Sequence, residues 1–141
     1  MKNLIFPVIA GVLIAIQSIF NQKLSLKSGI WLTVTMVHLT GLIASLIAYA
    51  YFRNYNVSSL LSANKVFWLG GVLGVFIIGS VIQGITNLGP AYTFIVMIFC
   101  QVLAMFFIEK FGLFGFEKSP LRYTQILGII LMFIGVFLYR K

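Results

Sequence analysis

Acidic residues are almost absent from this sequence, because Glu109 and Glu117 are the only two among its 141 residues. Charged residues of both signs make up 9% of the chain, whereas hydrophobic residues make up 61%. A soluble domain of this length keeps much of its surface in water and needs far more charge. The scarcity of charge therefore excludes an ordinary soluble fold and predicts a chain surrounded by lipid.

Residues that carry chemistry are scarce as well. Cys100 stands alone in an apolar run, which rules out an internal disulfide. His38 is the single histidine, and no second His or Cys stands near it to suggest a metal site. No nucleophile with its base and no phosphate-binding loop is present. We therefore expect no enzyme activity, no metal and no cofactor.

Ten Lys and Arg residues give the chain a formal charge of +8, which by itself would suggest a nucleic-acid partner. These cations lie at the ends of apolar runs, where they meet lipid headgroups. They do not form a continuous face that could follow a phosphodiester backbone. The sequence therefore predicts a lipid bilayer as the partner and no nucleic acid.

The apolar runs approach the roughly 20 residues that a helix needs to cross a bilayer. They predict helices over residues 4–24, 30–52, 66–86, 91–108 and 123–139. No cleavage site precedes Asn21, so we interpret the first run as a membrane helix and not as a signal peptide. The predicted fold is an all-α integral membrane protein, a five-helix transmembrane bundle in a single domain over residues 1–141.

Five crossings would place the two termini on opposite sides of the membrane, so the cations on each side test the orientation. The side of the N-terminus would hold Lys2, Arg53, Lys65, Lys110, Lys118 and Arg122, and the other side Lys23, Lys27, Arg140 and Lys141. Six against four is a weak bias for a protein of fixed orientation. The bias is compatible with fixed N-in insertion, but it also suggests insertion in both orientations.

Transporters are often built from two repeats of inverted topology, and a five-helix unit is half of such a structure. An antiparallel homodimer, or a heterodimer with an oppositely oriented sister chain, would supply the other half. Small residues allow membrane helices to approach closely. Gly128 and Gly135, seven residues apart in the last run, are the face that we assign to the dimer interface.

Polar residues inside apolar runs are the candidate binding residues, because each costs free energy unless it is paired or faces a cavity. They are Gln17, Asn21, His38 and Gln101. Gln17, His38 and Gln101 lie near the middle of their runs and could line one cavity. The alternative is that these side chains bond to a neighbouring helix, and for His38 a proton carrier and a packed core residue are equally open.

Glu109 falls just beyond the fourth predicted helix, which makes it a carboxylate at the mouth of such a cavity. Lys110, Lys118 and Arg122 stand near enough in sequence to neutralise it. No carboxylate lies at mid-membrane, so coupling through a central acid is not expected. The cavity should then suit a neutral, zwitterionic or anionic polar solute better than a bare cation.

Several short motifs resemble the YdcZ-like family of half-size proteins in the bacterial drug/metabolite transporter superfamily. The motifs are Gln17-x-x-x-Asn21-x-x-Leu24, His38-Leu39-Thr40-Gly41, Leu88-Gly89-Pro90-Ala91, Gln101, Glu109-Lys110-Phe111-Gly112-Leu113-Phe114-Gly115, and Arg122 with Gly128 and Gly135-Val136. The resemblance implies a multi-pass protein of the bacterial cytoplasmic membrane. The run from Gly128 to Val136 is also similar to the last helix of small multidrug resistance proteins, which implies the antiparallel dimer. Those relatives carry a glutamate near the place of Gln17, so their proton exchange does not carry over.

The leading hypothesis is a secondary transporter subunit that moves a small polar or amphipathic solute by alternating access as an antiparallel dimer. The first alternative is a dual-topology passive channel, which would show ohmic and non-saturating conductance. The second is a non-transporting membrane subunit, which would co-purify tightly with a larger assembly. Saturable flux with counterflow would separate the transporter from both.

Overall fold

The computed structural model of the chain describes residues 4–52, 57–120 and 122–139, and the elements in these ranges are all helical. The helices are α1 (Ile5–Ser28), α2 (Ile30–Phe52), α3 (Val57–Ser62), η2 (Lys65–Leu69), α4 (Gly70–Leu88), α5 (Pro90–Phe111), η3 (Leu113–Gly115) and α6 (Tyr123–Tyr139). Lys2, Arg53, Arg140 and Lys141, four of the cations that were counted for orientation, lie outside the described residues.

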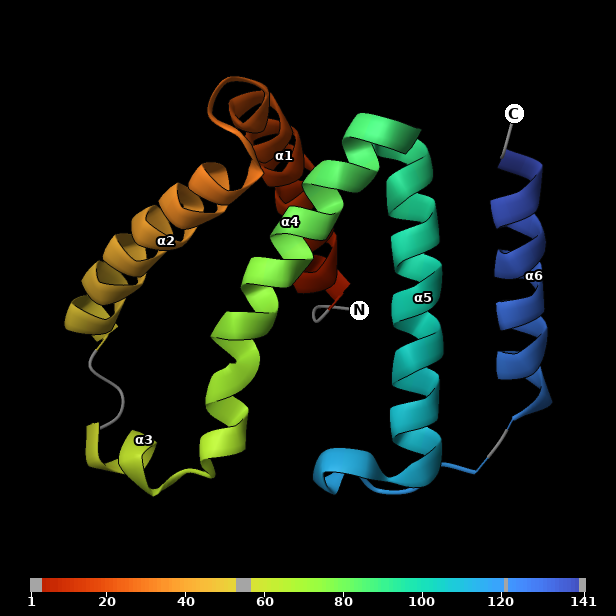
Figure 1. Cartoon of the computed structure of the whole chain (residues 1–141). Coiled ribbons are helices and arrows are strands. Elements are labelled where there is room, and N and C mark those ends of the chain that lie inside the picture. The colour runs from red at the N-terminus through yellow and green to blue at the C-terminus, as the bar shows by residue number, and fades with distance from the viewer. Residues whose placement is uncertain (1–3, 53–56, 121, 140–141) are drawn as a thin grey trace. The chain divides into compact units, whose positions relative to one another are not determined.

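Four segments are long and apolar enough to cross a membrane, which confirms an all-α membrane protein (Figure 1). They are Ile5–Ser28, Ile30–Phe52, Lys65–Leu88 and Pro90–Phe111. The apolar helix α6 has 17 residues and stands at the short end of the spanning range. The fifth crossing, and with it the five-helix count, stays a prediction.

Two helices are longer than the apolar runs predicted. Helix α1 continues past Leu24 to Ser28, where the hydroxyl groups of Ser25 and Ser28 donate to backbone carbonyls one turn earlier. Helix α5 continues past Ile108 to Phe111 and ends at Gly112, whose left-handed conformation caps it. In both cases the last turn contains a lysine, whose stem can cover apolar surface while its ammonium group reaches water.

The chain divides into two compact units, residues 1–86 and residues 87–141. The earlier expectation of a single transmembrane domain stays a prediction. The connection between two long helices turns sharply at Gly29 (φ 77°) and at Gly89 (φ 81°), where a side chain would be strained. In each corner the threonine four residues later donates its backbone N–H to the glycine carbonyl, and these residues are Thr33 and Thr93.

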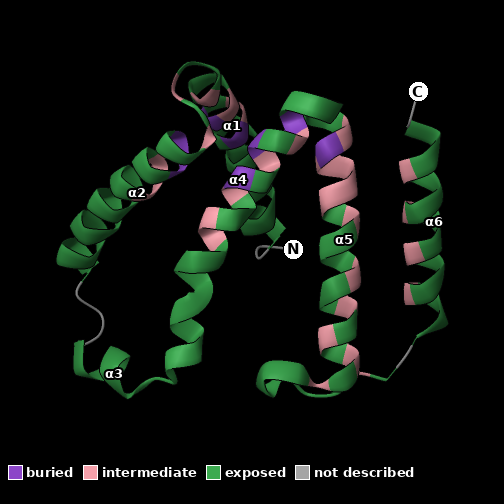
Figure 2. Ribbon diagram, in the orientation of Figure 1, coloured by how far each residue is buried: buried purple, intermediate pink, exposed green. Residues whose placement is uncertain are grey.

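In the first unit the buried side chains gather at the Gly29 corner. Thr33 is fully buried and bonds to Ser28 through the two hydroxyl groups, 2.9 Å apart. Ile82 of α4 is 1% exposed, and a Cβ on buried Gly79 would lie 3.7 Å from Ile30. Figure 2 shows the buried residues of α1, α2 and α4 at this end of the unit, while the opposite ends of α2 and α4 are exposed.

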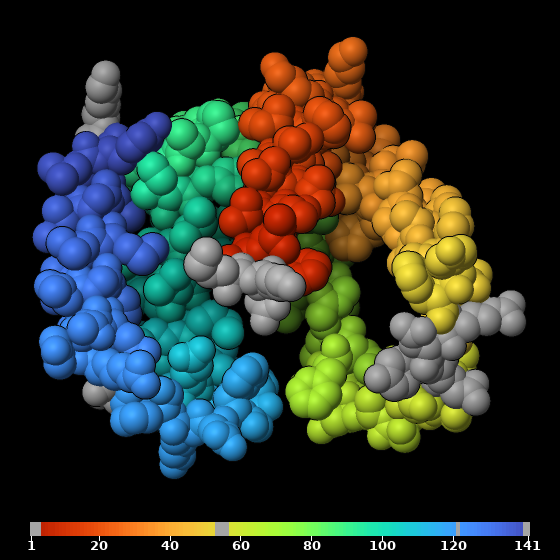
Figure 3. All heavy atoms as spheres, turned by 180° about the vertical axis from the view of Figure 1, so that it is seen from behind, coloured from red at the N-terminus to blue at the C-terminus, as the bar shows by residue number. Residues whose placement is uncertain are grey.

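In the second unit α5 and α6 lie side by side, as Figures 1 and 3 show from opposite directions. Aromatic rings join the two helices, because the centroids of Phe99 and Phe133 are 5.7 Å apart. Large apolar side chains stay exposed along both helices. Exposing so much apolar surface to water is unfavourable, so lipid or another protein chain must cover it.

Candidate functional site

Two of the candidate binding residues lie on α1 of the first unit, four residues apart and so on one helical face. Gln17 is exposed, whereas Asn21 is only 7% exposed. No hydrogen bond joins the Asn21 side chain to another described residue. No buried side-chain nitrogen or oxygen among the described residues lacks a partner, so the Asn21 amide reaches the surface, where it is a candidate contact for a bound molecule or for a second chain.

The third candidate of this unit, His38, bridges α2 and α4. Its Nδ1 lies 2.9 Å from the carbonyl oxygen of Val34. A carbonyl only accepts, so Nδ1 carries the hydrogen of this bond, and Nε2 is the ring nitrogen left for another partner. The Nε2 atom lies 3.2 Å from the place where a side chain at Gly74 would begin. The ring therefore lies close to the backbone of α4, in the space that a side chain at Gly74 would fill.

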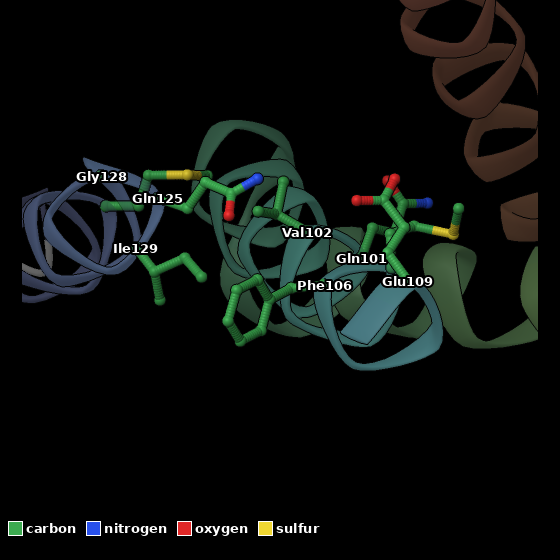
Figure 4. Close-up of a pocket in the computed structure, with 9 residues that line it drawn as sticks. Gln101, Val102, Phe106, Glu109, Gln125, Gly128 and Ile129 are labelled. Carbon is green, nitrogen blue, oxygen red and sulfur yellow. The ribbon is translucent and has the colours of Figure 1, made fainter. Parts of the chain in front are cut away.

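The second unit contains a groove of about 540 Å³ between α5 and α6, shown in Figure 4. It is lined by Gln101, Val102, Met105, Phe106, Glu109, Gln125, Gly128, Ile129 and Met132. Helical geometry explains the set, because Gln101, Met105 and Glu109 are spaced four apart on α5. On α6, Gln125, Gly128 and Met132 recur at helical spacing and face the same space.

The groove is apolar with three polar groups. Figure 4 shows the side chains of Gln101 and Glu109 pointing to the same side of α5, with Gln125 approaching from α6. Gln101 and Glu109 are eight residues apart, about 12 Å along the helix. Gln125 accepts the backbone N–H of Arg122 through Oε1, which leaves its amide hydrogens free. The groove thus offers two amides and one carboxylate along an apolar floor.

Glu109 forms no direct ion pair with the cations that stand near it in the sequence. These cations are Lys110, Lys118 and Arg122, all of which are described residues. The Nζ atom of Lys110 instead lies 5.4 Å from the centroid of the Phe111 ring. Because α5 extends to Phe111, the carboxylate belongs to the last turn of the helix and not to the connection after it.

The chain after α5 folds back and fixes the end that carries Glu109. The carbonyl oxygen of Glu109 accepts from the N–H groups of Gly112 and Ser119. A Cβ at Gly112 would lie 2.9 Å from the carbonyl oxygen of Phe116, so a larger residue has no room there. This closed turn holds the last turn of α5 in place and with it the position of the carboxylate.

The predicted site residues thus fall into two groups. Gln17, Asn21 and His38 belong to the first unit, and Gln101, Glu109 and Gly128 line the groove of the second. The single cavity that was expected to contain Gln17, His38 and Gln101 stays a prediction. Gly135 does not line the groove, and a Cβ on either Gly128 or Gly135 would meet nothing within 4 Å. Both glycines thus lie at open surface, and the dimer interface stays a prediction.

Sequence reasoning missed Gln125, because it stands two residues after Tyr123, where the apolar run was only beginning. Its spacing of three and seven residues from Gly128 and Met132 was the signal that could have found it. The same reasoning ended the fourth helix at Ile108, one residue before Glu109, whereas α5 continues to Phe111.

Residues 3–138 of the chain match the protein family described as "Putative inner membrane exporter, YdcZ". The match covers nearly the whole sequence. No curated protein and no solved structure is similar enough to the chain to count as a match.

Proposed function

Because the chain belongs to the YdcZ family of inner membrane exporters, we propose that it is one subunit of a secondary transporter that works by alternating access. The chain is a multi-pass protein of the inner membrane, and an exporter family is not an enzyme class. The proposed cargo is a small polar or amphipathic solute, bound between helices at membrane depth.

The groove between α5 and α6 carries this proposal. A volume of about 540 Å³ is within the range of sites for small molecules. Gln101 lies at the middle of α5, so a solute that fills the groove would reach about the centre of that span. A polar group at this depth is costly unless it serves a bound molecule or a partner helix. Gln17, Asn21 and His38 are the proposed contacts in the other unit.

The proposed assembly is an antiparallel dimer with the open glycines of α6 in its interface. Small residues that meet nothing within their own chain permit close approach of a second helix. A five-helix unit paired with an inverted copy would give the two-repeat architecture that alternating access uses.

Counterflow in proteoliposomes tests the proposal. The purified protein is reconstituted and loaded with one of a panel of solutes: alkylamines, alcohols, carboxylates and amino acids. A transporter accelerates entry of the labelled solute when the same unlabelled solute is inside, and the rate saturates. Ohmic conductance would identify a passive channel instead. Absence of flux, together with tight co-purification of another membrane protein, would identify a non-transporting subunit.

A further inference from the structure

The α5–α6 groove contains one negatively charged side chain and no positively charged one. Glu109 is the one charged residue among the nine that line it. The cations nearest in sequence, Lys110 and Lys118, do not line the groove and form no ion pair with this carboxylate. A carboxylate beside apolar surface attracts a positive group that is brought to it by an apolar body. The electrostatic complement of the groove is therefore a cation.

The shape and the rest of the lining define the remainder of the ligand. From Glu109 toward the middle of α5 the groove is flanked by Met105, Phe106 and Met132. Thioether side chains are flexible and polarisable, so they accommodate apolar groups of different shapes. Gln101 and Gln125 can accept or donate hydrogen bonds without requiring a second charge. The site therefore favours a ligand that has one charge at one end and an apolar body extending from it.

We propose that the α5–α6 groove binds an organic ammonium ion with an apolar tail, whose nitrogen lies at Glu109 and whose tail lies along Met105 and Met132. The proposal deepens the transport function and rests on it for its biological use. The depth of the groove is consistent with this orientation, because Glu109 lies about 13 Å from the middle of α5. The charge therefore stays near the headgroups while the tail lies in the apolar region, and the objection to a bare cation at mid-membrane does not apply.

Binding of a matched series of probes tests the proposal. Decylammonium, decanol and decanoate carry the same tail and differ in the charge of the head. The full chain is placed in phosphatidylcholine nanodiscs with ¹³C-labelled methionine methyl groups. The methyl signals of Met105 and Met132 report on the groove, whereas Met36 in α2 of the other unit reports on non-specific partition. We expect saturable shifts of the groove signals with decylammonium, weaker shifts with decanol and none with decanoate.

Two variants separate the charge from the cavity. Glu109→Gln should weaken decylammonium binding about ten-fold, which corresponds to about 1.4 kcal/mol, and leave decanol unchanged, because only the ammonium head loses a charged partner. Glu117→Gln is the matched control, because Glu117 is exposed and lies outside the groove. Gly128→Leu fills the groove and should abolish saturable shifts with both probes, while Gly135→Leu should not.

Equal binding of decanoate and decylammonium, or equal losses in Glu109→Gln and Glu117→Gln, would overturn the proposal. Phosphatidylethanolamine also carries an ammonium group and tails, so the titration is repeated in nanodiscs that contain it. Competition by this lipid would assign the site to a lipid headgroup, and its absence to a free amphipathic amine; both retain the ammonium. The measurement needs no flux. Binding without counterflow would reject the transport function and support the ammonium site. Counterflow without ammonium selectivity would support the transport function and reject the ammonium site.

Discussion

At His38 a single side chain connects two membrane helices. The ring is fixed on α2 by its bond to the Val34 carbonyl and rests on the bare backbone of α4 at Gly74. No other described residue partners Nε2. The histidine therefore serves helix packing in this structure, and its Nε2 atom has no partner among the described residues, so a packing role and a proton-carrying role are compatible.

Replacing Gly74 should disturb this contact selectively. The new Cβ of Gly74→Ala would lie 3.2 Å from Nε2, which forces the ring to move. Gly71→Ala is the matched control, because a Cβ there meets nothing within 4 Å. We expect Gly74→Ala to be less stable than Gly71→Ala by about 1 kcal/mol, the low end of overpacking costs. Unfolding in mixed detergent measures the difference, and equal stabilities would show that His38 does not bear on α4.

Gln17 is the residue whose removal should affect transport without affecting the fold. It is exposed and bonds to no other described residue, so Gln17→Ala leaves no partner unsatisfied. We expect at least a ten-fold lower counterflow rate for the panel solute that the wild type exchanges fastest, with unchanged expression and dimer content. Gln83→Ala, another exposed amide in a membrane helix, is the control. Equal rates for wild type and Gln17→Ala would remove this residue from the transport path.

Among the elements, the long apolar runs were the part of the fold that sequence predicted well. The spans of α2 and α6 agree with the predicted ranges, because aromatic or breaker residues mark both of their ends. The polar connection between residues 53 and 65 concealed the short helix α3. Six residues are too few for a hydrophobic period to be recognised.

The groove was harder to predict than the helices. It depends on which faces of α5 and α6 meet, and hydropathy is uninformative in a helix that is apolar all round. Gln101 was recognised by its depth alone. Glu109 was placed outside the helix because Ile108 closed the apolar run, although the charged residues Glu109 and Lys110 continue the helix to its glycine cap. The last turn of a membrane helix can carry charged residues where it reaches water. A helix end predicted from hydropathy alone leaves that turn out.

Helix α6 is the element that should hold the dimer together. Gly135 lies on its open surface and outside the groove, so Gly135→Leu should disrupt packing between chains without filling the binding site. We expect the dimer fraction in mild detergent to fall at least several-fold, because close backbone approach is lost. Gly71→Leu, at an equally open glycine of α4, is the control. Size-exclusion chromatography with light scattering measures it, and an unchanged dimer would place the interface elsewhere.

The orientation of the whole molecule in the membrane can be tested through the distribution of its positive charges. The weak excess of six cations over four predicts that both orientations are inserted. In a Cys100→Ala background, a cysteine at Asn3 or one added after Lys141 should each react with an impermeant maleimide from both sides of the membrane. If every copy places the N-terminus inside and no oppositely biased sister chain is present, the antiparallel homodimer is wrong.

Charge variants make this prediction directional. Lys23→Gln with Lys27→Gln removes two of the four cations on the minor side and changes the count from six against four to six against two. Since the side richer in Lys and Arg stays in the cytoplasm, this variant should be inserted almost wholly with the N-terminus inside. Lys65→Gln with Lys118→Gln also removes two cations but leaves four against four, so it should keep both orientations. An antiparallel homodimer needs both orientations, so the first variant should lose counterflow on its own and the second should keep it. Full activity of a uniformly oriented first variant would show that the working unit is not an antiparallel pair of this chain.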